Sequence, residues 1–331
     1  MVFEPIGLMD TFTLLRLPYV ALLIVLEQMD LDRIFHLSFH SKKFKKLCES
    51  LKFSVDDVTL TGSWNDFAIE FSKFDSKFHF VANSTNRELV KEPMRIIFPV
   101  GENESYADIL HREFEKCKRM MKIRKYGALF GRITDLKNVF LWKYTKDLGT
   151  LAVFNYDRTP VTRDDLLFLL NNIKCSYLIL QLSVPDFKYE GLIKSRRIIL
   201  TNANWIDTEK ISIDTNTEDM VFSGSYNESF INRLLKEWIS GMNEKLRALT
   251  CGSPFPIPDR NLNPDLVLTG IPTTQSTFTE EELRNRFAFG IVPDVLEIKR
   301  ETDGRLATVG LGTNEISLYV WHEEDLKKIG R

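Results

Sequence analysis

Residues 14–47 read LLRLPYVALLIVLEQMDLDRIFHLSFHSKKFKKL, and this stretch decides the fold of the N-terminal part of the chain. Pro18 suits the first turn of a helix, where its missing N–H removes a donor that would be unpaired anyway. Every residue from 19 to 26 is apolar, and a helix without a polar face must be buried on several sides. The pattern breaks at Asp30, and two further short helices are predicted over residues 32–37 and 41–51.

Three short helices of about 45 residues are too small to hold a comfortable core of their own. The third predicted helix has Phe44, Leu47 and Leu51 on one face, and its lysines point elsewhere, into water. One face of the first helix is therefore expected to meet a partner. The alternative is an ordinary pair of core helices in a larger domain.

The same residues carry a resemblance to a known family. The Leu-Pro pair at 17–18, the apolar helix behind it and the basic helix starting at Ser41 resemble an F-box. In that family the three-helix unit docks onto the Skp-type adaptor of a cullin-RING ubiquitin ligase. Many F-boxes have an acidic residue shortly after the Leu-Pro pair, whereas Tyr19 and Val20 are uncharged here. Carried over position by position, the implied adaptor contacts are Leu17, Pro18, Val20, Ala21, Val25, Leu26, Met29, Ile34, Leu37 and Ser38.

Length and composition limit the class of protein. The chain has 331 residues, room for one large or two ordinary domains, and its 44% hydrophobic content predicts a globular fold. A net charge of -2 argues against a surface built for nucleic acid, which would show a basic excess. The lysine run within residues 42–46 is interpreted as a solvated helix face.

The apolar run at 17–26 does not resemble a targeting segment. Residues 1–13 contain no Lys or Arg, and residues 27–30 offer no small-residue cleavage site. A membrane-spanning helix needs about 20 apolar residues, more than this run supplies. We therefore expect a soluble protein of the cytoplasm, or of the nucleus, that does not bind a membrane.

The sequence predicts neither a metal nor a cofactor. Cys48, Cys117, Cys175 and Cys251 are scattered without the spacing of a zinc site or a disulfide framework. His36 and His40 are predicted to lie on either side of a turn at 38–40, with no third ligand nearby.

Signatures of catalysis are incomplete. The Gly-Leu-Gly at 310–312 lacks the third glycine and the helix of a dinucleotide loop, and residues 322–324 lack the second histidine of a zinc protease. Acidic clusters at 164–165 and 280–282 are expected at helix N-termini, where the dipole favours them. Trp205, Trp238 and Trp321 are expected in the core. The chain is predicted to be non-catalytic.

Residues 52–130 predict a short β-region and then a helix. Alternating apolar residues indicate strands over 55–60, 67–71, 78–81 and 94–100. An amphipathic helix is expected over 105–125, with lysines at its C-terminal end that suit the helix dipole.

Residues 136–249 have a regular pattern of strands with helices between several of them. The strands recur roughly every 20–28 residues, a period typical of leucine-rich repeats. They are centred near Ala152, Leu178, Ile198, Val221 and Leu249. The consensus asparagine ladder is absent, so a compact βαβ domain with a parallel sheet is the competing interpretation. Helices are expected to start at Thr162 and Asn227, the latter reaching Met242, and a shorter one at Asn204 or Asp207.

A second resemblance covers residues 197–251, which look like the F-box associated domain, type 2, of the large nematode families of F-box proteins. The matching pieces are Trp205, residues 220–223, residues 230–238, Leu246 and Leu249. Residues 300–309 and 320–321 resemble the tail of those proteins. This resemblance implies a module that recruits a substrate, and it names no ligand.

The C-terminal region predicts a β-meander over residues 295–299, 306–309 and 316–321. The Asp303-Gly304 pair is typical of a hairpin with a type I′ turn, which needs positive φ at both central residues. A brief helix is expected over 280–286. Prolines between 254 and 264 predict a loop or linker before it.

The predicted fold class is therefore α/β (α+β), with a three-helix F-box, an irregular leucine-rich-repeat-like α/β domain and a C-terminal β-meander. The expected boundaries are a tail at 1–11, the F-box at 12–55, the α/β domain at 56–260 and the C-terminal extension at 261–331. The resemblances imply a non-catalytic substrate-receptor subunit of an SCF-type E3 ubiquitin ligase, which reaches the cullin and RING subunits through the adaptor and recruits an unidentified target protein. A non-degradative scaffold and an enzyme of an unrecognised family are the alternatives.

Overall fold

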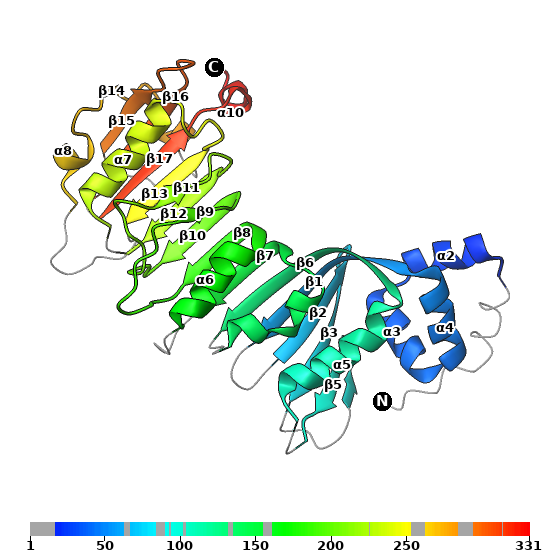
Figure 1. The fold of residues 1–331 in the computed structure, drawn as a ribbon. Helices are drawn as coiled ribbons and strands as arrows, with labels where there is room; N and C mark the ends of the chain where they lie inside the picture. Colours follow the sequence, from blue (N-terminus) through cyan, green and yellow to red (C-terminus); the bar gives the residue numbers. More distant parts are fainter. Residues whose placement is uncertain are drawn as a thin grey trace. The chain divides into compact units, whose positions relative to one another are not determined.

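The computed structural model describes residues 17–62, 67–83, 90–92, 94–101, 104–131, 135–154, 161–224, 226–252, 262–283, 294–312 and 314–331. These residues belong to two compact units. Unit 1 is Met1–Ile133 with Asn138–Thr145, and unit 2 is Thr134–Lys137 with Lys146–Arg331. The fold class is confirmed, because three N-terminal helices are followed by a strand-rich region of mixed α/β type (Figure 1).

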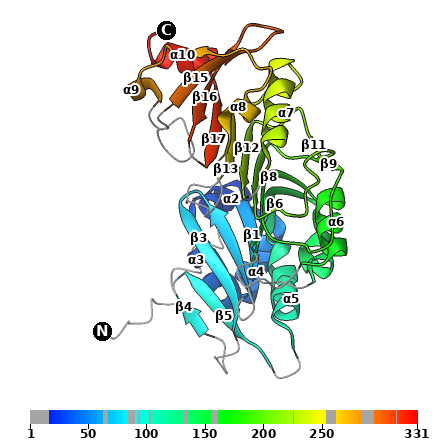
Figure 2. The same cartoon turned by 90° about the vertical axis from the view of Figure 1, so that its left-hand side faces the viewer.

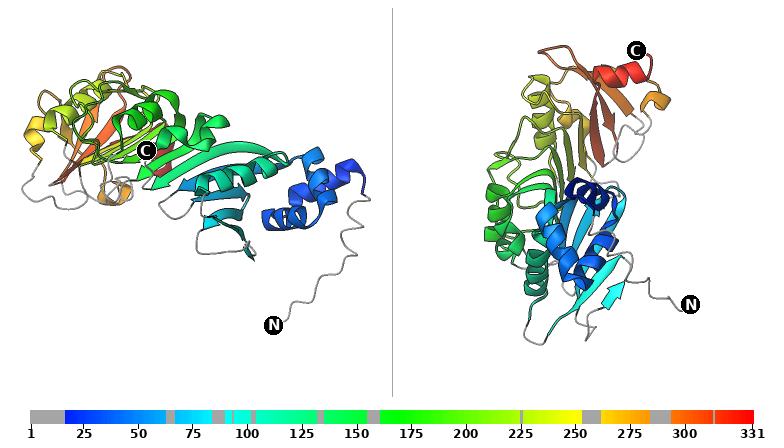
Figure 3. Two further views of the ribbon diagram at one scale, coloured as in Figure 1. Left: turned by 60° about the horizontal axis from the view of Figure 1, so that its bottom comes forward. Right: turned by 90° about the vertical axis from the view of Figure 1, so that its right-hand side faces the viewer.

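Unit 1 begins with three helices, which are α2 (Tyr19–Gln28), α3 (Leu31–His40) and α4 (Lys42–Leu51). Figure 3 shows them, in blue, gathered into one bundle. The Ser41 side chain caps α4 by accepting a hydrogen bond from the Phe44 N–H. The turn predicted at 38–40 is wrong, because α3 continues through it and the Ser38 hydroxyl donates to the Phe35 carbonyl one turn earlier. His36 and His40 consequently lie on the same helix.

The sheet of unit 1 has the strand order β6-β1-β2-β3-β5-β4. Figure 2 shows β1 and β3 of this sheet, with β5 and β4 at its edge. β1 pairs with β2 and β2 with β3 in antiparallel fashion, whereas β1 pairs with β6 and β3 with β5 in parallel. All four predicted strands of this region are present. The strands are β1 (Phe53–Gly62), β2 (Phe67–Lys73), β3 (Ser76–Asn83), β4 (Val90–Glu92), β5 (Arg95–Pro99) and β6 (Met121–Gly131).

The predicted helix at 105–125 is partly confirmed. It is α5 (Tyr106–Lys118), capped by the Ser105 side chain, and it keeps only two of the predicted C-terminal lysines, Lys116 and Lys118. Lys122 and Lys125 lie on β6 instead, because residues 121–130 pair with β1. Two 3-10 turns, η1 (Leu136–Asn138) and η2 (Phe140–Lys143), follow.

An aromatic cluster joins the helices to the sheet within unit 1. The ring of Phe35, from α3, lies 6.2 Å from Phe53, 5.0 Å from Phe71, 4.9 Å from Phe78 and 5.2 Å from Phe80, measured between ring centroids. All five side chains are fully buried. Aromatic pairs at these separations stabilise a core beyond the area they bury. The helices therefore share one core with the sheet.

Unit 2 contains parallel strands in sequential order, β7-β8-β10-β12-β13. Each predicted strand centre lies in one of them, so the predicted recurrence of strands is confirmed. A small parallel pair is formed by β9, which follows β8 in the chain, and β11, which follows β10. The strands are β7 (Asp147–Phe154), β8 (Lys174–Gln181), β9 (Leu192–Ile193), β10 (Arg197–Thr201), β11 (Ser212–Ile213), β12 (Asp219–Ser223) and β13 (Ala248–Gly252).

Two of the three helices predicted for this region are present. α6 (Arg163–Asn172) is capped by Thr162 and α7 (Glu228–Ile239) by Asn227, whose side chains accept from N–H groups in the first turn. α7 ends before Met242, which is exposed. The helix predicted at Asn204 or Asp207 is wrong, because the Asp207 carboxylate accepts from the N–H groups of Glu209 and Lys210 and closes a turn.

The C-terminal strands form the predicted meander, and its last strand, β17, pairs antiparallel with β13. The predicted type I′ turn is wrong. Only Gly304 has positive φ, at 71°, while the buried Arg300 guanidinium and the exposed Asp303 carboxylate close a longer turn through an ion pair. The remaining elements are α8 (Pro264–Val267), β14 (Thr274–Gln275), α9 (Glu280–Leu283), β15 (Asp294–Lys299), β16 (Leu306–Leu311), β17 (Glu315–Val320) and α10 (Glu323–Lys328).

Two predictions about the segments before the meander are tested only in part. Pro264 opens α8 at its first helical position rather than lying in a loop, while the prolines at 254–258 lie outside the described residues. The helix predicted at 280–286 is present as α9, and residues 284–286 lie outside the described range.

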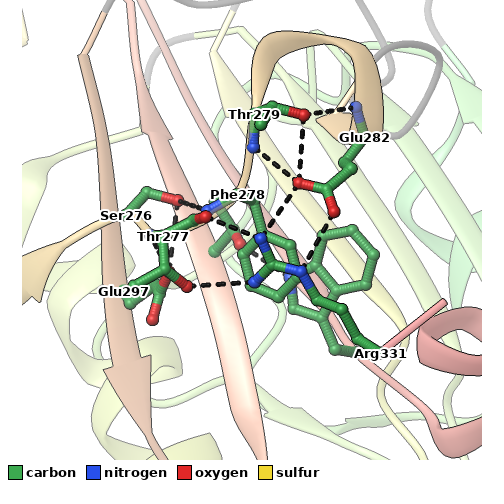
Figure 4. A network of polar contacts seen from close by, with 9 residues as sticks. Ser276, Thr277, Phe278, Thr279, Glu282, Glu297 and Arg331 are labelled. Carbon is green, nitrogen blue, oxygen red and sulfur yellow. Dashed lines mark hydrogen bonds and ion pairs between the residues drawn. The ribbon is translucent and has the colours of Figure 1, made fainter. Parts of the chain in front are cut away.

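The segment before β15 is fastened to the end of the chain by a polar network (Figure 4). The Arg331 guanidinium donates to the Thr277 carbonyl at 2.7 Å and to the Glu282 carboxylate at 3.0 and 3.1 Å. It also lies over the ring of Phe278, which stacks on Trp321 with the ring centroids 4.0 Å apart. This network closes a second small core at the C-terminal meander.

Candidate docking surface

The most exposed apolar side chains of the N-terminal helices lie along α2. Val20 is 65% exposed and Ile24 is 58% exposed, and Leu17, which lies just before the helix and its N-cap Pro18, is 38% exposed. Val20 and Ile24 are four positions apart and therefore lie on the same face of the helix. We call Leu17, Val20 and Ile24 the α2 stripe. A row of exposed apolar side chains on one helix face is typical of an interaction surface.

The opposite side of α2 is fixed to unit 1. Leu22 and Leu26 are buried in the core. The Glu27 carboxylate accepts hydrogen bonds from the Ser54 N–H at 3.0 Å and from the Ser54 hydroxyl at 2.9 Å. Since Ser54 belongs to β1, these contacts hold the helix against the sheet and leave the α2 stripe facing outward.

The C-terminal end of α2 is capped by a lysine from β2. The Lys73 ammonium donates to the Leu26 carbonyl at 2.9 Å and to the Met29 carbonyl at 3.1 Å. A cation suits a helix C-terminus, where the last carbonyls lack partners within the helix. The Lys73 residue is only 2% exposed, and this burial lowers the pKa of its side chain.

The ten residues predicted to contact an adaptor divide into three groups by burial. Leu17, Pro18 and Val20 are exposed, and Ala21, Val25, Met29 and Leu37 are half-buried. Leu26, Ile34 and Ser38 lie in the core of the chain itself. In this structure those three would support a docking surface rather than form it. Their contact with an adaptor stays a prediction, as it does for the other seven.

Two exposed apolar residues of the same helix were not among the predicted contacts. Tyr19 is 59% exposed, and Ile24 continues the α2 stripe one turn beyond Val20. The four-residue spacing from Val20, a predicted contact, to Ile24 would have added Ile24 only if the exposed face had been known. Because residues 19–26 are all apolar, the sequence alone does not show which face is covered by the sheet.

The lysine-rich helix α4 has the arrangement that its sequence predicts. Phe44, Cys48 and Leu51 are buried, whereas Lys42, Lys43 and Lys46 are exposed. Its basic residues are therefore a solvated face around a buried apolar stripe.

Among the described residues, nucleophilic and metal-ligating side chains do not gather into a second candidate site. A groove of about 580 Å³ in unit 2 includes Cys175, Tyr189 and Ser195 in its lining. Burial raises the pKa of the Cys175 thiol to about 11, so the thiol is uncharged near neutral pH and is a poor nucleophile. Within the described ranges, His, Cys, Asp and Glu form no group of three or more that could hold a metal ion. None of the described helices is long and apolar enough to span a bilayer.

Comparison with known proteins identifies the N-terminal part alone. No curated protein and no solved structure matches the chain. Among protein families, the F-box domain matches residues 14–56. That range covers α2, α3, α4 and the start of β1, and it contains the α2 stripe. The chain therefore carries an F-box domain at residues 14–56.

Proposed function

We propose that the chain is a substrate-receptor subunit of an SCF-type E3 ubiquitin ligase. F-box domains generally bind Skp1-type adaptors, and this F-box presents the α2 stripe on the outside of a helix whose other side is fixed by Leu26, Glu27 and Lys73. The exposed stripe on a rigidly held F-box helix is the observation that carries the proposal. A preorganised apolar surface loses little conformational entropy on binding.

Unit 2 would then recruit the target protein. The ring of Phe222 in β12 packs on Phe230 of α7, with ring centroids 5.3 Å apart. Neighbouring residues of a strand point to opposite faces of a sheet, so Ile179, Ile199 and Val221 lie on the face away from α7, in register on three adjacent strands. These half-buried apolar side chains, with the Arg197–Asp219 ion pair beside them, offer a mixed surface suited to a protein partner.

The mechanism is proximity. The F-box would hold the adaptor, unit 2 would hold the target, and the catalytic subunits of the ligase would transfer ubiquitin to a target lysine. Tethering raises the effective concentration of that lysine near the charged ubiquitin carrier. The chain itself would act without catalysis, in the cytoplasm or the nucleus. Residues 197–251 would correspond to the F-box associated type 2 domain of the nematode family that they resemble, and residues 300–309 and 320–321 to the tail of those proteins.

Binding to a purified Skp-type adaptor tests the proposal. Val20→Asp in the full chain places a charge in the middle of the expected interface, where desolvation of a carboxylate costs several kcal/mol. The expected result is a loss of affinity of at least about a hundredfold. Ile34→Asp would not serve, because Ile34 is fully buried and the change would unfold the helix bundle.

Met242→Asp is the matched control for Val20→Asp. Met242 is 58% exposed and lies in unit 2, away from the F-box residues in sequence. The Met242→Asp variant should bind the adaptor with the affinity of the unsubstituted chain. Both variants should keep the circular dichroism spectrum of the unsubstituted chain. Wild-type affinity of Val20→Asp for the adaptor would show that the α2 stripe is not the docking surface and would remove the basis of the proposed function.

A further inference from the structure

Phe74 is the most exposed large apolar side chain in the described part of the chain, with 76% of its surface accessible. It lies in the two-residue turn between β2 and β3, where Lys73 pairs with Ser76. Met94, which precedes β5, is 54% exposed, and its carbonyl accepts a hydrogen bond from the His79 N–H of β3. Two large apolar side chains are thus presented from neighbouring parts of the unit 1 sheet.

The backbone at Phe74 is strained. Its φ is 51°, in the left-handed region, where glycine and asparagine are at ease and bulky side chains are uncommon. Glycine, asparagine and aspartate are favoured in two-residue hairpin turns for this reason. The ring contributes little to the fold, because it lies mainly in solvent and its one recorded ring contact is with the Lys73 ammonium, 6.0 Å from the ring centroid.

The turn is fastened to the F-box. Lys73, directly before Phe74, donates to the last carbonyls of α2, and the Phe74 N–H donates to the Asp56 carboxylate at 2.8 Å. Asp56 also pairs with Arg124 at 3.0 Å. These contacts fix the turn relative to α2 within unit 1.

The α2 stripe leads to this turn. Val20, Ile24 and Gln28 follow one another at four-residue intervals on α2, so they lie on one face. Gln28 lines an open groove of about 490 Å³ whose other lining residues include Met29, Phe74 and Met94. The exposed face of the F-box helix therefore leads, through Gln28 at the edge of this groove, to Phe74 and Met94.

The charged groups at the groove do not favour a small anion as its occupant. The Lys73 ammonium already donates to two carbonyls, and the Lys77 ammonium pairs with the Glu70 carboxylate at 2.8 Å. Asp30, Asp32 and Asp75 add negative charge to the rim. A protein surface that brings an apolar side chain into the groove suits this lining better.

We propose that the adaptor-binding surface of this chain extends beyond the F-box helices onto Phe74 and Met94, and that the occupant of the groove is the same adaptor subunit that covers the α2 stripe. This inference rests on the proposed function. It adds a second contact region, from residues outside the F-box match at 14–56.

Phe74→Asn in the full chain separates a binding role from a structural one. Asparagine tolerates the left-handed region, so the variant should unfold at the same or a higher temperature than the unsubstituted chain. Removal of an aromatic anchor from an interface should weaken adaptor binding about tenfold or more. Adding Met94→Ser to Phe74→Asn should weaken adaptor binding further. Met242 in unit 2 is similarly exposed, and Met242→Ser should leave the affinity unchanged.

The two proposals fail in distinguishable ways. If Val20→Asp abolishes binding while the Phe74→Asn and Met94→Ser double variant binds like wild type, the F-box function stands and the extended surface is refuted. If the unsubstituted chain is a dimer in light scattering and the double variant is a monomer with undiminished adaptor affinity, the groove serves a second copy and the inference is likewise refuted. Loss of adaptor affinity with retained thermal stability supports it.

Discussion

His322 precedes α10 in a partly buried position where a neutral imidazole is favoured. Its Nδ1 lies 3.3 Å from the Arg305 guanidinium, and since arginine only donates, Nδ1 must accept and be unprotonated. Burial, followed by the nearby charges of Arg305 and Arg247, lowers the pKa of His322. In the unfolded chain the pKa of histidine is near 6.5.

This difference predicts a pH dependence of stability. Above about pH 6.5 the imidazole is neutral in both states, and as the pH falls further the unfolded chain takes up a proton before the folded chain does. The contribution of His322 to stability should therefore decrease as the pH falls from about 6.5 to the lowered pKa of the folded chain. We expect a lower urea midpoint at about pH 5 than at about pH 7.5.

The control is His322→Gln, which cannot titrate. It should reduce the loss of stability between the two pH values without abolishing it, because burial also lowers the pKa of His111. An unchanged pH dependence in His322→Gln would contradict the assignment.

At the residue scale, the sequence predicts burial best where the size and polarity of the side chain alone determine it. Trp205, Trp238 and Trp321 are buried as expected, because such large apolar surfaces are rarely left in water without a partner. Leu26 and Ile34 were expected at an interface and are buried in the core of the chain. Their burial depends on strands that follow later in the sequence, so no local pattern could reveal it.

At the scale of elements, α7 is held by a cap at its start and by a continuous apolar face. The Asn227 side-chain oxygen accepts a hydrogen bond from the Phe230 N–H at 3.0 Å. Asn227→Ala should lower the free energy of unfolding by about 1 kcal/mol, because that N–H would lose its partner. Urea unfolding of the full chain measures the change.

Asn227→Asp keeps an acceptor oxygen at the same position and should be close to wild type in stability. Equal destabilisation by alanine and aspartate would mean that a contact other than the cap matters at Asn227.

The strands and capped helices were predictable because their signals are local. The period-2 alternation placed β1, β2 and β3, and single side chains placed the starts of α6 and α7. Two of the wrong predictions, the helix at Asn204 or Asp207 and the type I′ turn at 303–304, have one reason. Asp207 and Asp303 have side chains that suit more than one local structure, and the choice was made by their neighbours, which are a pair of N–H groups for Asp207 and the Arg300 guanidinium for Asp303.

For the whole molecule, the shared core of unit 1 bears on how the F-box can be removed. A fragment of residues 56–331 lacks α2, α3, α4 and the first residues of β1. It would expose Phe71, Phe78 and Phe80, which Phe35 covers in the full chain. We expect this fragment to bind an apolar dye strongly and to associate in size-exclusion chromatography.

The full chain with Val20→Asp is the control for that fragment, since it should lose the adaptor without losing the core. A monomeric fragment that unfolds cooperatively and binds no dye would show that the sheet is stable without the helices.

The division of the molecule into two units follows from contacts between residues distant in sequence, which composition does not report. The domain boundaries expected at 55 and 260 stay predictions. The F-box itself could be predicted because the Leu17-Pro18 pair, the apolar helix behind it and the basic helix from Ser41 resemble the family in one continuous stretch.

The packing of Phe35 limits whether the F-box of this chain can be replaced by the F-box of another protein. In an F-box from another chain that replaces residues 14–51, the residue equivalent to Phe35 would have to pack against the rings of Phe53, Phe71, Phe78 and Phe80. A donor with a small residue at the equivalent position would leave a void there, and voids of aromatic size weaken a core by about 3–5 kcal/mol. The F-box of this chain therefore cannot be exchanged for another without loss of stability, because Phe35 of α3 and the aromatic side chains of the sheet can change only together.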